Sequence, residues 1–239
     1  MTYCVGVWLD SGLVLASDSR TNAGVDQVGT FRKMTVYERP GDRVMVLLSS
    51  GNLSVTQAVI SLMEQQANQN QPSLWTVPTM YEAARLVGEN LREIHKRDGP
   101  YLKERNIDAS AGFILAGQIS GERHRLFNMY TEGNFIEATP ETPYIQNGEL
   151  KYGKPILDRV ITTTTSLAEA VKCVLVSFDS TMRSNISVGL PIDLLCYERD
   201  SLKVGTQRRI LDNDVYFQTI TRTWQEGLRR LLMELPAPP

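Results

Sequence analysis

The N-terminal segment constrains the fold more than any other part of this sequence. Residues 3–9 and 13–17 are apolar runs of strand length, and Asp10, Ser11 and Gly12 between them have the composition of a tight turn. The pattern predicts a β-hairpin that begins almost at the first residue. Because a terminus that opens a core strand is held in place rather than frayed, the first residues can belong to a functional site.

Thr2 lies at the start of this hairpin, and its side chain is small enough for bacterial-type removal of Met1. Removal would leave a hydroxyl and a free α-amine on one residue. An α-amine has an ordinary pKa of about 7.7–8.0, so part of it is neutral at neutral pH and can accept a proton. Thr2 is therefore a candidate for a residue that supplies both nucleophile and base. Taken alone, a Met-Thr start more often marks an ordinary processed terminus.

The first half of the chain continues with a strand, two helices and three more strands. Residues 43–50 form an apolar run of strand length, and apolar residues then recur at helical spacing as far as Asn68. Thr79 and Glu82 have the spacing of a capping box, which predicts the start of a second helix. Residues 98–100, Asp-Gly-Pro, are expected to interrupt that helix. Three further strands are predicted at residues 111–119, 124–130 and 135–138.

The second half repeats this alternation. Ser166 and Glu169 form another capping box, and Asp214 is the expected cap of the final helix. A short helix is also predicted at residues 154–162, and strands are predicted at residues 187–198 and 202–210. This order of elements predicts layered α+β packing in a single domain over residues 1–239, of which residues 235–239 form a frayed tail.

Several separated motifs, in this order, resemble a known family. They are Thr2, D-S-G-L-V-L-A-S-D-S-R from Asp10, F-R-K-M from Phe31, S-S-G-N from Ser49, and S-T-M-R-S-N-I-S-V-G-L-P-I-D-L from Ser180. The chain resembles the β-type subunits of proteasomes, which are N-terminal-nucleophile hydrolases, and in particular the bacterial ancestral-β-subunit branch known as Anbu. The resemblance runs over nearly the whole chain. It implies a four-layer αββα sandwich and a threonine-type endopeptidase that works inside a homo-oligomeric ring or open spiral.

The resemblance also implies roles for particular residues. Thr2 would be the nucleophile, and the positive charge of Lys33 would lower the cost of removing its hydroxyl proton. Asp18 would hold and charge-pair Lys33, and Arg20, two residues further along the same predicted strand, would support them. The backbone N–H of Gly51 would stabilise the oxyanion, because a glycine between a strand and a helix presents an N–H without a side chain in the way. The alternatives are a surface ion pair of Asp18 with Arg20, a solvated Lys33, and a glycine needed only for the turn.

One part of the sequence departs from the family pattern. Ser187 matches a family serine near the nucleophile, but Ser184 stands where an aspartate is expected. Glu149 replaces the serine of a Gly-Ser-Gly turn. Both replacements remove groups that orient the terminal amine or its water. Two alternatives to a general peptidase therefore stay open: a narrow-specificity amidase on the same fold, and a catalytically idle subunit for assembly or peptide binding.

Composition narrows the functional classes further. Charged residues make up 22% of the chain and its formal net charge is -2, which gives no electrostatic argument for nucleic-acid binding. No run of about 18 apolar residues is present, so no membrane span is predicted. The apolar N-terminus lacks a basic segment and is interrupted by Asp10, so it is not interpreted as a signal peptide. We expect a cytoplasmic protein whose three cysteines are thiols.

Metal and cofactor chemistry are not expected. The sequence has two histidines, His95 and His124, and no Cys/His cluster at metal-binding spacing. Cys4, Cys173 and Cys196 lie in apolar contexts that are typical of small core residues. The expected partners are a peptide or protein substrate and other copies of the chain. The sequence leaves open whether an ATP-dependent partner exists.

Overall fold

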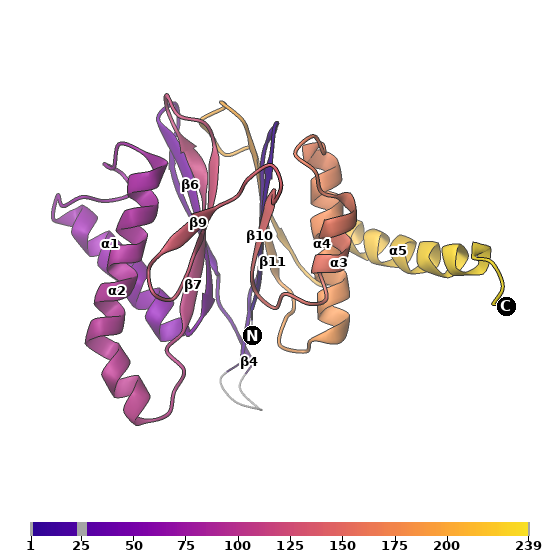
Figure 1. The fold of residues 1–239 in the computed structure, drawn as a ribbon, viewed down its shortest axis with the longest axis horizontal. Helices are drawn as coiled ribbons and strands as arrows, with labels where there is room; N and C mark the ends of the chain where they lie inside the picture. Colours follow the sequence, from indigo (N-terminus) through magenta and orange to yellow (C-terminus); the bar gives the residue numbers. More distant parts are fainter. Residues whose placement is uncertain (1, 23–27, 239) are drawn as a thin grey trace.

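Two antiparallel β-sheets lie face to face at the centre of the molecule, and helices cover their outer faces (Figure 1). The computed structural model describes residues 2–22 and 28–238. The first sheet has the order β10-β1-β2-β11-β12, with bounds Tyr144–Gly148, Tyr3–Leu9, Gly12–Asp18, Ile192–Glu198 and Thr206–Ile210. The second sheet has the order β5-β6-β7-β8-β9, with bounds Met34–Arg39, Arg43–Gly51, Ala111–Ile119, Arg125–Met129 and Phe135–Glu137. A separate hairpin consists of β3 (Arg20–Asn22) and β4 (Val28–Thr30).

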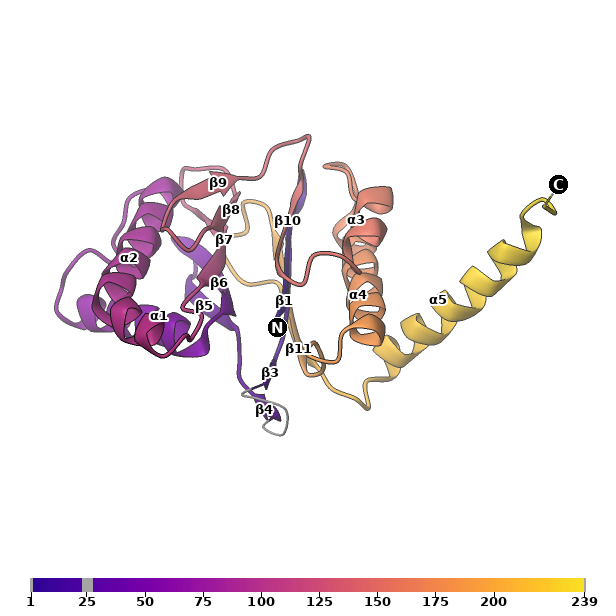
Figure 2. The same ribbon diagram turned by 60° about the horizontal axis from the view of Figure 1, so that its bottom comes forward.

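The helices complete four layers. The second sheet is covered by α1 (Leu53–Asn68) and α2 (Met80–Glu104), whereas α3 (Lys154–Val160) and α4 (Leu167–Ser184) cover the first (Figure 1, Figure 2). The predicted α+β fold with αββα layers is therefore confirmed. The last helix, α5 (Val215–Glu234), starts beside α4 and then leaves the body of the molecule. Within the described ranges, no helix combines the length and the apolar character that crossing a membrane requires.

The alternation of side chains along β1 explains how one strand serves two cores. Tyr3, Val5 and Val7 belong to the apolar cluster beneath α3 and α4. Cys4, between them in sequence, belongs to the cluster between the two sheets. Successive side chains of a strand point to opposite faces, so an almost continuous apolar run fits a strand that is buried on both sides. All of β1 is buried except Trp8, which is half-buried, and the strand pairs with β2 on one side and β10 on the other.

One helix runs through the point at which the sequence predicts a break. Thr79 caps α2 as expected and accepts a hydrogen bond from the Glu82 N–H at 3.1 Å, but the helix continues past Pro100 to Glu104. Pro100 is exposed and removes only one backbone donor. Leu102, in the last turn, packs against the core cluster beneath α1 and α2. The predicted interruption was wrong because packing of the last turn outweighs the loss of a single hydrogen bond.

The strand predictions also differ from the structure at β10, β11 and β12. β10 was not predicted, because only Ile145 among its residues is buried and no clear alternation marks it. The strand predicted at residues 187–198 begins at Ile192, and the strand predicted at residues 202–210 begins at Thr206. The loop that precedes β11 lies beside the end of β2, since the first residue of β11 pairs with the last residue of β2.

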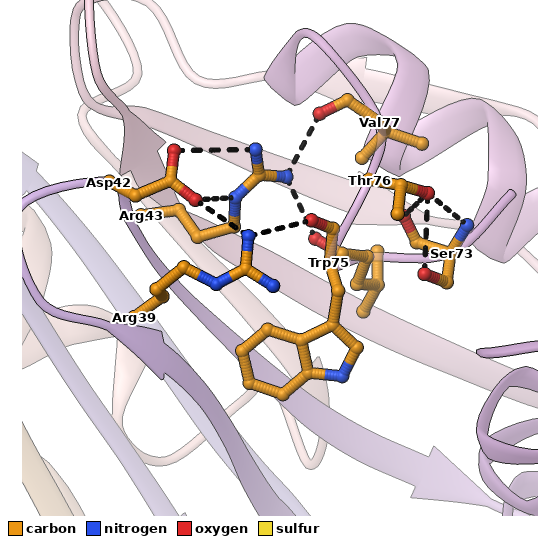
Figure 3. Close-up of polar contacts among 8 residues, drawn as sticks. Arg39, Asp42, Arg43, Ser73, Trp75, Thr76 and Val77 are labelled. Carbon is orange, nitrogen blue, oxygen red and sulfur yellow. Dashed lines mark hydrogen bonds and ion pairs between the residues drawn. The ribbon is translucent and has the colours of Figure 1, made fainter. Parts of the chain in front are cut away.

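Two arginines fix the connection between α1 and α2 to the β5–β6 hairpin (Figure 3). The buried Arg43 donates to the carbonyl oxygens of Leu74 and Val77 at 3.1 and 2.9 Å. Its Nε also donates to the Asp42 carboxylate at 2.7 Å, and Arg39 donates to the same carboxylate at 3.2 Å. These bonds satisfy loop carbonyls that would otherwise be buried without partners. They lie at the start of β6, away from its C-terminal end, and we interpret them as structural.

The outer half of α5 continues an apolar stripe that begins inside the molecule. Phe217 is buried in the cluster beneath α3 and α4, and among the described residues of α5 it alone is buried. Apolar side chains then recur on the same side of the helix at Trp224, Leu228, Leu231 and Leu232. The three leucines are 48, 53 and 70% exposed. Figure 2 shows that this half of the helix lies away from the other elements, so the stripe is open to solvent in a single copy of the chain.

Candidate active site

The carboxylate of Asp18, at the end of β2, is the meeting point of the predicted site residues. Its Oδ1 accepts hydrogen bonds from Lys33 Nζ at 2.6 Å and from the Tyr3 backbone N–H at 3.0 Å. The side chains of Lys33 and Asp18 are 4% and 0% exposed, so they form a buried ion pair. Because the Tyr3 N–H belongs to the peptide that joins Thr2 to Tyr3, the pair lies directly beside the buried Thr2. The structure therefore brings Thr2, Asp18 and Lys33 together.

The ion pair places a fixed positive charge next to Thr2. Burial raises the pKa of the Asp18 carboxyl above its ordinary value, and the Lys33 ammonium and a backbone hydrogen bond from Gly189 oppose that rise. Lys33 Nζ makes a second hydrogen bond to the Arg20 carbonyl oxygen at 2.7 Å. A buried charge is costly unless it is paired and hydrogen-bonded. Both conditions are met here, so the lysine ammonium is held in one place.

Arg20 contributes through its backbone rather than through its charge. The chain leaves β2 at Asp18 and Arg20 opens β3, so the two residues do not lie on one strand as predicted. The Arg20 N–H donates to Asp18 Oδ2 at 3.2 Å, whereas its guanidinium donates to the Ile186 carbonyl oxygen at 2.8 Å. The guanidinium also covers Gly189, where a Cβ would lie 2.3 Å from Arg20 Cζ. The side chain therefore fastens the loop that precedes β11.

Gly51 ends β6 in a conformation that favours glycine, with a φ of 90°. A Cβ at this position would lie 2.3 Å from the Ser110 carbonyl oxygen, so no side chain fits there. Gly51 borders a cavity of about 240 Å³ that is also lined by Gly148. A Cβ on Gly148 would in turn lie 2.0 Å from the Thr2 carbonyl oxygen. The cavity thus lies between Gly51 and the residue that abuts Thr2, which is compatible with the predicted oxyanion role of Gly51.

Ser187 is connected to Thr2 through two residues that the sequence did not pair. The Ser187 N–H donates to Asn185 Oδ1 at 2.9 Å, and Asn185 Nδ2 donates to Glu149 Oε2 at 2.7 Å. The Glu149 N–H donates in turn to the Thr2 carbonyl oxygen at 2.7 Å. Asn185 and Glu149 are 8% and 7% exposed. This chain of hydrogen bonds ties the loop before β11 and the end of β10 to the candidate nucleophile.

Part of this network had a signal in the sequence. Asn185 stands two residues before Ser187, and asparagine side chains commonly bond to the N–H two residues further on. The bond between Asn185 and Glu149, in contrast, joins positions that are 36 residues apart, for which no periodic pattern exists. Ser184, which stands at the position expected for an aspartate, is the exposed last residue of α4.

Other nucleophiles are poorly placed. Burial raises the pKa of Cys4, and it raises the pKa of Cys173 to about 12 and that of Cys196 to about 11. All three are free thiols, and such pKa values leave little thiolate at neutral pH. Within residues 2–22 and 28–238, no group of three or more His, Cys, Asp or Glu side chains is placed to hold a metal ion.

Several solved structures share both the fold of this chain and about half of its sequence. Anbu (ancestral beta-subunit) from Yersinia bercovieri is 48% identical to the chain, with 99% of both chains covered and a TM-score of 0.94. A Gly-1 mutant of Anbu from Hyphomicrobium sp. strain MC1 is 49% identical, with 100% of both chains covered and a TM-score of 0.93. The helical assembly of the Anbu complex from Pseudomonas aeruginosa is 50% identical, with 99% of this chain and 98% of that chain covered and a TM-score of 0.95.

These matches identify the family of the chain, although two other comparisons found no match. No protein-family model and no curated protein matches the sequence. Identity of 48 to 50% over at least 98% of each chain, together with the shared four-layer fold, is far more than a similarity of fold alone. The chain therefore belongs to the Anbu family, the ancestral β-subunit branch of the proteasome-type proteins.

Proposed function

We propose that this protein is a threonine-type peptidase that works through Thr2 after Met1 has been removed. The observation that carries the proposal is the buried ion pair beside Thr2, in which Lys33 Nζ lies 2.6 Å from Asp18 Oδ1. In a site that excludes water, a fixed ammonium stabilises a neighbouring developing oxyanion far more than it would in solvent. A buried pair costs free energy to form, and its position beside Thr2 suits a catalytic role.

The proposed chemistry has two steps. In the first, Thr2 Oγ attacks the carbonyl carbon of a peptide bond, and its proton passes to the α-amine of Thr2. The Gly51 N–H donates to the oxyanion, and the new ammonium gives its proton to the leaving amine as the C–N bond breaks. An ester between Thr2 and the acyl half of the substrate remains. In the second step water attacks this ester, its proton passes to the amine and then to Oγ, and the ester C–O bond breaks.

We also propose that the peptidase works as a homo-oligomer. The relative from Pseudomonas aeruginosa was solved as a helical assembly. In this chain, the exposed apolar stripe of α5 includes Leu228, Leu231 and Leu232, and stripes of this kind typically mark protein–protein contacts. A second copy of the chain is the partner that the family resemblance favours. Assembly would then control access of substrates to the site.

One observation favours a second candidate function. Ser184, at the position where a family aspartate is expected near the nucleophile, is exposed at the end of α4. A subunit that assembles and binds peptides without hydrolysing them has no need of a carboxylate there. This candidate predicts assembly without turnover, whereas the peptidase proposal predicts both.

Intact mass spectrometry separates the two candidates. The protein is incubated with a peptide epoxyketone, which reacts with a hydroxyl and a free amine carried by the same residue. We expect loss of Met1 and one adduct per chain in the wild type, no adduct in Thr2→Ala, and unchanged assembly in both. Thr2→Ser keeps both reactive groups and serves as the matched control that retains the adduct.

A control removes the dependence on cellular removal of Met1. The chain is also produced as a fusion protein whose cleavage leaves Thr2 as the first residue. An assembled protein with Thr2 exposed, no adduct and no cleavage of a mixed peptide library would contradict the peptidase proposal and favour the assembly subunit. Cleavage of a single short amide, with no cleavage of the library, would favour a narrow-specificity amidase.

A further inference from the structure

We infer that Glu149 binds the α-amine of Thr2 and holds it in position for proton transfer. The inference rests on the proposed function in one respect, because the amine is free only once Met1 has been removed. Glu149 touches the amine and not the substrate in this scheme, so it is a positioning residue. Its backbone placement, the surroundings of its carboxylate and the charges nearby all favour this role.

The backbone places Glu149 opposite Thr2. β10 pairs with β1 up to the register of Tyr3 with Gly148, and the Glu149 N–H continues the ladder by donating to the Thr2 carbonyl oxygen at 2.7 Å. Gly148 has a φ of 86°, and a Cβ there would lie 2.0 Å from the same carbonyl oxygen. The chain therefore turns against the Thr2 backbone just before Glu149, and a larger residue at position 148 would push the two strands apart.

The carboxylate of Glu149 is buried and stabilised by uncharged amide donors. Oε1 accepts a hydrogen bond from the Lys151 N–H at 2.9 Å, and Oε2 accepts one from Asn185 Nδ2 at 2.7 Å. Burial acts to raise the pKa of Glu149, but these hydrogen bonds outweigh it and hold the pKa below its ordinary value. The group is therefore ionised at neutral pH. The Leu150 N–H is a third donor to the carboxylate. Because each carboxylate oxygen accepts two hydrogen bonds, an acceptor position remains for a cation.

The other charged groups around Thr2 already have partners. Asp18 is paired with Lys33 at 2.6 Å, and the Arg20 guanidinium is bonded to a backbone carbonyl. The side chain of Lys151 acts on Glu149 only through its charge, which lowers the pKa of the carboxyl. Glu149, which the backbone places opposite Thr2, thus offers an ionised carboxylate with an acceptor position left. A buried carboxylate gains most from a paired cation, and the processed terminus supplies one.

This arrangement has a measurable consequence for the amine. A carboxylate beside an ammonium stabilises it, so Glu149 raises the pKa of the amine above the ordinary α-amine value of about 7.7–8.0. The fraction that can accept a proton at pH 7 becomes smaller, and in return the nitrogen is fixed in place. Loss of the carboxylate should lower the amine pKa by about one unit or more, and it should also release the amine from its position.

The test measures the amine itself, in the Thr2→Ala variant with Met1 removed, where no hydroxyl nucleophile is present. The pKa is obtained from the pH dependence of acetylation of the amine by limiting acetic anhydride, read by mass spectrometry of the N-terminal peptide. We expect a value above about 8, and a fall of about one unit or more when Glu149→Gln is added. Glu104→Gln, at the exposed end of α2, is the matched control and should leave the value unchanged.

Two results would overturn the inference. An amine pKa at or below the ordinary range in Thr2→Ala is the first, and it needs no substitution at Glu149. Equal values with and without Glu149, in samples whose thermal melting and oligomeric state show that they are folded, are the second.

Labelling separates this inference from the proposed function. In the wild-type background, Glu149→Gln should move the rise of epoxyketone labelling to lower pH by the same amount. It should also lower the plateau rate by roughly ten- to a hundred-fold, the size of effect expected from a misplaced reacting group. If no epoxyketone ever labels the protein but the amine pKa falls as expected, the peptidase proposal fails and positioning by Glu149 stands.

Discussion

The region around Thr2 and the outer half of α5 are opposites in physical character. Around Thr2, charged groups are buried: the side chains of Lys33 and Asp18 are 4% and 0% exposed. In the outer half of α5, apolar groups are exposed: Leu232 is 70% exposed and Met233 is 84% exposed. Burying charges and exposing large apolar side chains both cost free energy in an isolated chain. Each region therefore needs a compensating interaction.

The two regions find that compensation in different places. The charges of Asp18 and Lys33 are paired with each other and hydrogen-bonded to the backbone within one chain. The apolar stripe of α5 lies away from the other elements (Figure 2), and in our proposal a second copy of the chain covers it. The buried charges are thus compensated within one protomer, whereas the exposed apolar stripe is not. Substitutions in one region should leave the property of the other unchanged.

Lys33→Met should have the largest effect, and the effect should be confined to the region around Thr2. It leaves the buried Asp18 carboxylate without its cation, which costs about 3–5 kcal/mol of stability. Epoxyketone labelling should be abolished, while the folded fraction keeps its oligomeric state. Burial raises the folded-state pKa of Asp18, so the folded state binds this proton more tightly than the unfolded state. The loss of stability is therefore greatest at neutral pH and shrinks toward the unfolded pKa of about 3.9, which thermal unfolding across pH measures.

Asp18→Asn combined with Lys33→Met is the matched control, because it removes both charges together. The double variant should regain stability without regaining labelling. Wild-type labelling in either variant would show that the ion pair has no part in the chemistry. Loss of assembly in a stable double variant would show that the two regions are coupled after all.

Leu232→Glu should have the converse effect. A carboxylate in the apolar stripe is costly at a packed interface but not in solvent, so assembly should be lost while the melting temperature of the protomer changes little. Thr223→Glu is the matched control, since Thr223 is exposed and lies on the opposite side of the same helix by its period of about 3.6 residues. Size-exclusion chromatography with light scattering measures the mass. Equal masses for Leu232→Glu and the wild type would contradict the assignment of α5 to assembly.

Much of the fold could be predicted from the sequence because its signals are local. The apolar run of β1 and the capping box of Ser166 with Glu169 each depend on residues a few positions apart, and the structure contains both. The errors arose where packing at a distance decides. The last turn of α2 is held by the packing of Leu102 beyond Pro100, and β10 has only Ile145 buried, so its pairing with β1 leaves no pattern.

The candidate site was predictable only where family motifs brought its residues together. Asp18 and Lys33 come from different segments, and the motif order anticipated that they meet beside Thr2. The pairing of Glu149 with Asn185 could not be anticipated, because it is a polar contact between two loops and has no periodicity. In the sequence, Glu149 is recognisable only as the residue that replaces a family serine. Once the backbone places it opposite Thr2, the same replacement puts a buried carboxylate there.

Arg20→Ala should have a modest effect, which sharpens the contrast with Lys33. The Arg20 side chain donates to the Ile186 carbonyl oxygen, but its contacts with Asp18 and Lys33 come from its backbone and survive the substitution. A single hydrogen bond contributes about 0.5–1.5 kcal/mol net, so the labelling rate should fall by less than about tenfold. Arg20→Lys, which keeps a donor, should recover part of the loss. Complete loss of labelling with normal melting would mean that the guanidinium itself takes part in the chemistry.

Glu149→Gln should have the smallest effect on stability, and its pH dependence identifies the cause. Burial acts to raise the pKa of Glu149, but hydrogen bonds from Lys151 and Asn185 hold it below its ordinary value in the folded protein. A carboxyl with a lowered folded pKa contributes stability above its unfolded pKa of about 4.3, and this stability is lost as pH falls through the lower folded value. Because glutamine does not titrate, the difference in melting temperature between wild type and variant should be largest near neutral pH and vanish in acid. A difference that stays constant with pH would mean that Glu149 acts through shape alone, and the region around Thr2 would then depend on charge only at Asp18 and Lys33.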